Sequence, residues 1–183
     1  MREFFTRALV LERKDLGEVD GLVFFFTQDY GKIVARAKGL RKIKSKLSGH
    51  LQPLKFVKVR FLRLAGPNDG FAVVDCLEDE RFRDYQTHKR FDLLPLVSLV
   101  NQMTMELEAD KKLWFFLEEI FRRSFDLKET LRAFLKILGF DPEKASCFFC
   151  HRKEVTSFLW EDHIFLCAQH SLKVPSNKII SIK

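Results

Sequence analysis

The sequence predicts an α+β protein with an N-terminal five-stranded β-barrel of the OB type in residues 1–80, a small α-helical domain in residues 81–140, and a C-terminal zinc module in residues 141–183. Three observations support this. The first eighty residues hold five short β-rich runs separated by turn residues. From about Arg83 the apolar spacing becomes helical. Three of the four cysteines then lie beyond residue 146. A length of 183 residues allows one or two domains and a small module.

The barrel rests on five strand-like runs: Phe4–Leu11, Gly21–Thr27, Lys32–Ala37, Leu54–Leu64 and Phe71–Leu77. The second and third are joined by the short turn 28–31, which contains glycine and is typical of a hairpin. Residues 57–61 alternate between apolar and basic side chains, and this alternation slips at 62–64, which predicts a bulge. Five short strands with basic faces favour a small closed OB-type barrel over a sandwich.

Between the third and fourth runs, Leu40, Ile43 and Leu47 are spaced for one helical face, and Gly49 can end such a helix. A helix or loop here would plug one end of the barrel.

Helices are predicted further along the chain. The apolar residues of segment 91–107 suggest a long helix that Pro95 breaks or kinks. Asp110 reads as the N-cap of a helix whose apolar face runs from Leu113 to Phe121. Asp126 and Glu129 form a capping-box pattern before the apolar face 127–138, which Gly139 closes.

The cysteines indicate a metal site. Cys147-Phe-Phe-Cys150 is followed by sixteen residues and then by Cys167-Ala-Gln-His170. Two such tight turns can each offer two ligands to one tetrahedral zinc, and the residues between them form a hairpin. Four ligands fill the ion, so we expect a structural zinc rather than a catalytic one. His163 and His151 are alternative fourth ligands, and the alternative without metal is buried thiols with His170 on the surface.

Positive charge is concentrated in one stretch. Residues 30–68 hold eleven lysines and arginines and no acidic residue, whereas the rest of the chain has 21 basic against 25 acidic residues. Such a field attracts nucleic acid, because each neutralised phosphate releases counterions. The alternative is a solvated basic loop. We expect the following residues to bind DNA: Lys32, Arg36, Lys38, Arg41, Lys42, Lys44, Lys46, Lys58 and Arg60.

Phenylalanines are interleaved with the basic strands at positions 24, 25, 26, 56 and 61, where they would stack on bases or fill the core. Cys76 lies within the fifth strand pattern and is predicted to be a core thiol. The sequence has no P-loop, no GxGxxG after a strand and no GxSxG, so we expect no enzyme activity. No signal peptide or membrane-spanning run is present, which favours the cytoplasm and argues against a membrane partner.

In this order, the features resemble the RecO family of bacterial recombination mediators. The opening is similar in its Thr27–Lys32 turn, in the basic segment after it and in the stretch Gly49–Leu54. A second similarity joins Phe134–Pro142 to Cys147-Phe-Phe-Cys150, as at the family's junction between helical domain and zinc module. The chain departs from the family in its short helical part and in His170, where relatives can carry cysteine.

The resemblance implies an OB domain, a helical domain and a zinc module. It also implies binding of single- and double-stranded DNA, annealing of complementary strands, and help in loading RecA onto DNA in DNA damage repair by the RecFOR pathway. RecR and the C-terminal tail of the single-strand-binding protein are the implied partners, and RecA is served indirectly. The residues leave two other readings open: a zinc-containing OB-fold RNA-binding protein, and an adaptor that binds an acidic protein tail and no DNA.

Overall fold

The computed structural model describes residues 2–65, 70–82, 91–123 and 126–183. They form two compact units, 1–122 and 123–183. The boundaries predicted at residues 80 and 140 remain predictions. The helices of segment 81–140 are divided between the units. Those that end at or before residue 122 belong to the same unit as the barrel, and the later one belongs to the second unit.

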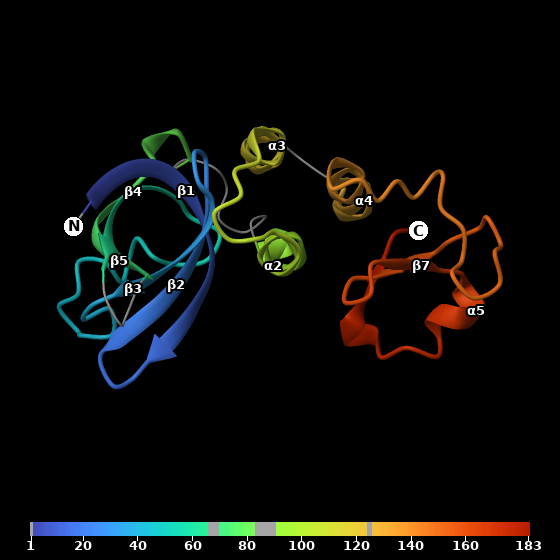
Figure 1. Ribbon diagram of the computed structural model, residues 1–183, viewed down its shortest axis with the longest axis horizontal. Helices are drawn as coiled ribbons and strands as arrows, with labels where there is room; N and C mark the ends of the chain where they lie inside the picture. The colour runs from blue at the N-terminus through green and yellow to red at the C-terminus, as the bar shows by residue number, and fades with distance from the viewer. Residues whose placement is uncertain (1, 66–69, 83–90, 124–125) are drawn as a thin grey trace. The chain divides into compact units, whose positions relative to one another are not determined.

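The first unit is built on a closed barrel in the strand order β1-β2-β3-β5-β4 (Figure 1). Its strands are β1 (Arg2–Leu16), β2 (Asp20–Thr27), β3 (Gly31–Ala37), β4 (Phe56–Leu64) and β5 (Gly70–Glu78). The long strand β1 pairs antiparallel with β2 through its second half and with β4 through its first half. Parallel pairing of β3 with β5 closes the circle. The predicted five-stranded OB-type barrel is therefore confirmed.

The barrel core forms because alternate side chains of every strand point inward. It contains Val23 and Phe25 of β2, Ile33 and Ala35 of β3, and Phe61 of β4, all fully buried. The bulge predicted at residues 62–64 of β4 is wrong, since β4 stays in register with β1 through Arg63. The irregularity lies between Arg60 and Phe61 in the pairing with β5, whose Val74 has no partner across the ladder.

Residues 38–55 form turns rather than the predicted helix. Leu40 and Leu51 from this segment are buried in the barrel core, which agrees with the expected plug. Ile43, however, is fully exposed and shares no buried face with Leu40. Leu47, the third residue of the predicted apolar face, packs partly buried against the same core. Of the three residues with helical spacing, only Ile43 therefore fails to contribute to the plug.

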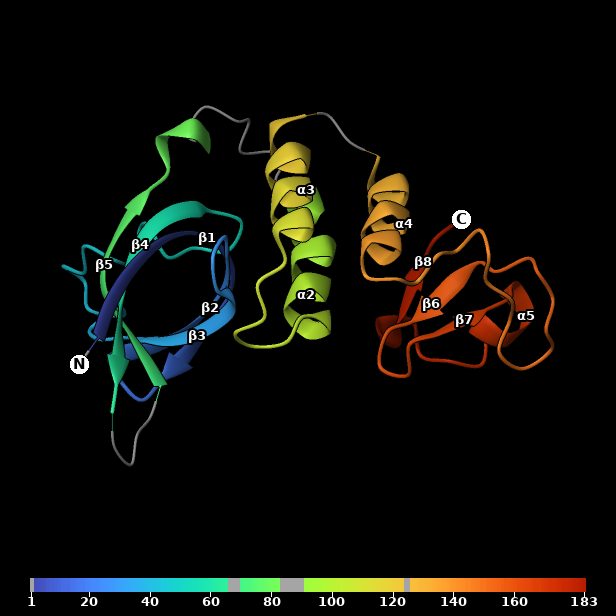
Figure 2. The same ribbon diagram turned by 45° about the horizontal axis from the view of Figure 1, so that its top comes forward.

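Two helices accompany the barrel in the first unit, α2 (Leu94–Met103) and α3 (Lys111–Arg122) (Figure 2). Pro95 does not break a longer helix, because it lies in the first turn of α2, where its missing N–H is not needed. Leu107 lies outside any helix and is exposed with φ 61°. Asp110 caps α3 as predicted, accepting a hydrogen bond from the Leu113 amide at 2.9 Å.

An aromatic cluster joins α3 to the barrel. Phe56 of β4 stacks on Phe82 with ring centroids 3.9 Å apart. Phe56 also forms T-shaped pairs with Trp114 and Phe121 of α3, with ring centroids 5.6 and 5.1 Å apart. All four side chains are at least 95% buried, so this contact is a second hydrophobic core of the unit.

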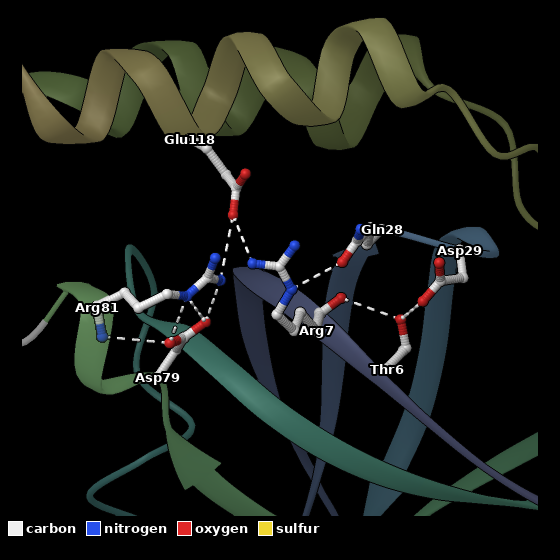
Figure 3. A network of polar contacts seen from close by, with 7 residues as sticks. All are labelled: Thr6, Arg7, Gln28, Asp29, Asp79, Arg81 and Glu118. Atoms are coloured by element: carbon white, nitrogen blue, oxygen red, sulfur yellow. Dashed lines mark hydrogen bonds and ion pairs between the residues drawn. The ribbon is translucent and has the colours of Figure 1, made fainter.

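A buried polar network lies beside this cluster (Figure 3). Glu118 of α3 accepts hydrogen bonds from Arg7 of β1 at 2.9 Å and from Arg81 at 3.2 Å. Asp79 pairs with the same Arg81 guanidinium, and Arg7 also donates to Gln28 at 2.7 Å. The network fixes α3 against the barrel through the buried carboxylates of Glu118 and Asp79, whose arginine partners remain partly exposed.

The second unit begins with α4 (Leu127–Ile137), whose N-cap Asp126 accepts from the Glu129 amide as predicted. The predicted hairpin is confirmed as β6 (Ser157–Leu159) and β7 (Ile164–Leu166). A third strand, β8 (Ile179–Ser181), pairs with β6 and was not predicted. The short helix α5 (Ala168–Ser171) follows β7. In the part of the chain that is described, no helix is long and apolar enough to cross a membrane.

Candidate metal centre and nucleic-acid surface

Four side chains of the second unit meet at one point. The ligand atoms of Cys147, Cys150, Cys167 and His170 all lie within 4.8 Å of one another. The Nδ1 atom of His170 is 3.4 Å from the Cys147 sulfur and 3.3 Å from the Cys167 sulfur. The sulfurs of Cys150 and Cys167 are 3.7 Å apart. His170 completes the group, and neither His163 nor His151 belongs to it.

These distances suit a tetrahedral ion. With metal–sulfur bonds of about 2.3 Å and a metal–nitrogen bond of about 2.0 Å, adjacent ligand atoms would lie about 3.5 to 3.8 Å apart. The four groups therefore need little movement to bind one ion, and they leave no coordination position open for a substrate.

Local backbone structure explains how the two pairs face each other. The Cys147–Cys150 turn is closed by a hydrogen bond from the His151 amide to the Cys147 carbonyl at 2.8 Å, with φ of 57° at His151. This is a left-handed conformation that often needs glycine. On the other side, Cys167 is the N-cap residue of α5, which brings His170 back beside the sulfurs one helical turn later.

The surroundings shift the pKa of two of the thiols in opposite directions. Burial raises the pKa of Cys147, but hydrogen bonds from the backbone amides of Cys167, Cys150 and Phe149 outweigh it and lower the pKa to about 6. A hydrogen bond from the Arg152 amide lowers the pKa of Cys150. Burial and the adjacent sulfurs together raise this pKa by more, so the net shift is upward. Because the thiolate is the metal-binding form of cysteine, the lowered pKa of Cys147 favours metal binding, and metal binding releases the remaining thiol protons.

The fourth cysteine plays no part in this group. Burial raises the pKa of Cys76 to about 12, and its side chain belongs to the barrel core. The predicted core thiol is confirmed.

The basic residues expected to bind DNA divide into two groups. Four lysines of the turn segment, which we call the loop lysines, are exposed and form no ion pair among the described residues: Lys38, Lys42, Lys44 and Lys46. They line an open groove beside Val73 and Val74 of β5. A groove lined by four unneutralised ammonium groups is suited to a phosphate chain.

The second group, except Lys58, has partners within the protein. Arg36 pairs with Asp20 at 2.6 Å, Arg41 with Asp15 at 3.5 Å, and Arg60 with Glu3 at 3.4 Å. Lys32 donates to the Asn101 carbonyl at 2.8 Å, and burial lowers its pKa. Lys58 is exposed on the outer face of β4. The sequence could not separate these groups, because their partners are distant along the chain.

Most of the phenylalanines that could have stacked on bases are buried in the protein. Phe25, Phe26, Phe56 and Phe61 are buried, and Phe24 is half-buried beneath the Lys14 ammonium. Among the described residues of the barrel, the most exposed ring is instead that of Phe5, 63% exposed and opposite Arg60 in the β1–β4 pairing. The alternation of Phe4 and Phe5 along β1 was the sequence signal for it, since one of two successive strand residues must face outward.

The sequence matches known proteins over most of its length. Residues 1–67 match the family model described as Recombination protein O N terminal. The DNA repair protein RecO of Caldanaerobacter subterraneus is 29% identical over 86% of this chain and 67% of its own length. The DNA repair protein RecO of Myxococcus xanthus is 32% identical over 82% of this chain and 64% of its own length. The DNA repair protein RecO of Syntrophobacter fumaroxidans is 26% identical over 94% of this chain and 73% of its own length. The chain thus spans about two thirds of the length of these relatives.

Proposed function

Because the chain belongs to the RecO family, we propose that it is a DNA-binding mediator of recombinational repair that performs no covalent chemistry. It binds single- and double-stranded DNA and anneals complementary strands. By family relationship we assign it RecR and the tail of the single-strand-binding protein as partners in loading RecA. The observation that carries the DNA-binding part is the groove lined by the four loop lysines, which form no ion pair among the described residues.

Annealing requires that two phosphate backbones be neutralised at once while their bases stay free to pair. Lysine ammonium groups act as point charges on flexible stems and hold a backbone without fixing base edges. The loop lysines serve one backbone, and Lys58 with Arg60 on the outer face of β4 serves the other. Annealing by two such basic surfaces needs neither nucleotide hydrolysis nor a divalent ion at the strands.

We further propose that the ion bound by Cys147, Cys150, Cys167 and His170 is zinc. Soft thiolates and an imidazole in a tetrahedral arrangement favour this ion over magnesium or calcium. When bound, zinc supplies cross-linking that a unit of some sixty residues lacks in its hydrophobic core. The cysteines position the turn and α5, and the metal has no role in contacting strands.

The test is a strand-annealing assay combined with filter-binding competition between single-stranded DNA and RNA of the same sequence. We expect faster pairing at low salt without nucleotide, declining as salt screens both backbone contacts. We expect DNA to compete at least as well as RNA. No acceleration at low salt, together with preferential binding of RNA, would replace this proposal with an RNA-binding function. Binding to neither would favour the adaptor that contacts an acidic protein tail.

A further inference from the structure

The metal-binding turn presents two aromatic rings to solvent. Phe148 and Phe149 lie between Cys147 and Cys150, and 60% and 58% of their surfaces are exposed. The rings meet edge to face with centroids 5.3 Å apart, and Phe149 also lies 5.2 Å from the His170 ring. These contacts hold the pair in a defined orientation while much of each ring stays uncovered.

Metal binding does not account for this pair. In a Cys-x-x-Cys turn the two sulfurs point to the ion, so the two middle side chains point away from it and can be polar. Exposing two adjacent phenylalanines is unfavourable in water, and such patches mark binding surfaces. Leu172, which ends α5, is 87% exposed and adds to the apolar surface in the same unit.

The surroundings of the rings are cationic. Residues 144–153 and 163–183 contain no acidic residue. Arg152, Lys153 and Lys173 are exposed and form no ion pair among the described residues. The Arg152 carbonyl accepts from the Cys147 amide, and the Lys173 amide donates to the His170 carbonyl, so both lie next to the metal-binding turns.

The acidic residues of this unit offer little competition. Asp141 and Glu143 pair with Lys136, and Glu161 pairs with Lys178. Glu154 is exposed, directly follows Lys153 and is the nearest acid along the chain. The charge pattern thus disfavours a basic partner and matches a ligand that combines anionic groups with flat, unpaired rings.

We propose that Phe148 and Phe149 form a stacking platform for the bases of a single nucleic-acid strand, whose phosphates are neutralised by Arg152, Lys153 and Lys173. Stacking on aromatic rings is tolerant of sequence because every base has a π-face. This inference rests on the proposed function and adds to it a second contact, separate from the loop lysines and selective for unpaired bases. Duplex DNA, whose bases are already stacked, is bound by charge alone at this unit.

The experiment uses the full zinc-loaded chain. Phe148→Ala/Phe149→Ala is compared with wild type for binding to oligo(dT) and to an abasic strand of the same length, which keeps the phosphates and lacks the bases. The matched control is Phe115→Ala, which removes a ring of similar exposure, 57%, from α3 in the other unit. Zinc content and the unfolding midpoint of each variant verify that the metal-binding unit is intact.

We expect the double variant to bind oligo(dT) roughly 5- to 100-fold more weakly and the abasic strand as wild type does, with the control unchanged on both. Photo-cross-linking with 5-iodouracil strands should map to residue 148 or 149. Equal oligo(dT) affinity in the double variant and wild type overturns the platform but leaves the proposed function intact. An equal loss on both strands also overturns the platform. A wild-type protein that binds no single strand refutes the proposed function itself.

Discussion

Arg7 of strand β1 donates a hydrogen bond of 2.9 Å to Glu118 of α3, a carboxylate whose side chain is only 9% exposed. The Arg81 guanidinium reaches the same oxygen at 3.2 Å (Figure 3). The contact links residues 111 positions apart and shows that α3 belongs to the barrel unit. A carboxylate this deeply buried is tolerated because two cations satisfy it.

Glu118→Ala should therefore destabilise the first unit by about 2 kcal/mol, since it leaves two guanidinium groups partly buried with a lost partner. Urea unfolding followed through Trp114 fluorescence measures this loss, with Trp160 of the second unit replaced by phenylalanine in all the proteins compared. Lys112→Ala, an exposed change on the same helix, should shift the free energy of unfolding by no more than about 0.5 kcal/mol. Equal effects from the two changes would show that the network contributes nothing.

Gly31 is the second structural test. Its φ is +69°, and a Cβ added there would overlap the backbone of Glu108, in the segment whose Leu107 amide donates to the Lys32 carbonyl at 2.9 Å. Gly31→Ala should displace that segment and cost several kcal/mol. Gly17 has a similar φ of +64° with open space around it, so Gly17→Ala should cost only about 1 kcal/mol. Thermal unfolding of both variants separates backbone strain from steric overlap.

Local patterns predicted the elements that depend on neighbouring residues. Short β-rich runs between turn residues predicted the five strands, with alternation visible in two of them, and side-chain capping predicted the starts of α3 and α4. The ligand group was predictable because its four members form two short, self-contained turns. The predictions that were wrong concern features that depend on distant partners. The predicted helix placed Leu40 and Ile43 on one buried face, whereas only Leu40 is buried. The predicted bulge was placed in β4, whereas the unpaired residue is Val74 of β5.

The candidate DNA surface was predictable only as a region. The sequence places eleven cations between residues 30 and 68 but cannot show that Asp20 lies against Arg36, or that Lys32 reaches the Asn101 carbonyl. Those pairings arise from strand registers and from the packing of α2. The phenylalanines were equally ambiguous, since only the fold decides which rings face the core.

The metal should control the second unit alone. Cys150→Ser, or removal of the ion by a chelator, should increase amide hydrogen exchange from about residue 141 onward and leave the barrel protected, because the two units have separate cores. Metal analysis of the wild type should give one zinc per chain. His163→Ala removes a histidine outside the ligand group and should keep the ion. Loss of zinc in that variant would reassign the fourth ligand.

Asp20 predicts a pH dependence. It accepts hydrogen bonds from the Gly39 amide at 2.7 Å and from Arg36, and these hold its pKa below the ordinary value of 3.8. A carboxylate with a lowered folded pKa stabilises the fold above the unfolded value, and this contribution is lost as pH falls through the folded pKa. Stability should therefore decline below about pH 4, and Asp20→Asn should flatten that part of the curve. The measurement is the free energy of unfolding of wild type and Asp20→Asn as a function of pH. The same slope below about pH 4 in both proteins would contradict the prediction.

The loop lysines give the most direct test of the DNA surface. Neutralising Lys42, Lys44 and Lys46 together as glutamines should weaken binding to every DNA sequence, because lysines on phosphates carry no base readout. The slope of log affinity against log salt should fall by about 2 for a single strand, at roughly 0.7 per lost phosphate contact. The matched control neutralises three exposed lysines elsewhere, Lys111, Lys112 and Lys128, and so makes the same change in net charge. Its slope should stay close to wild type. If both triple variants flatten the slope equally, the general charge of the protein, and not the groove beside β5, attracts the DNA.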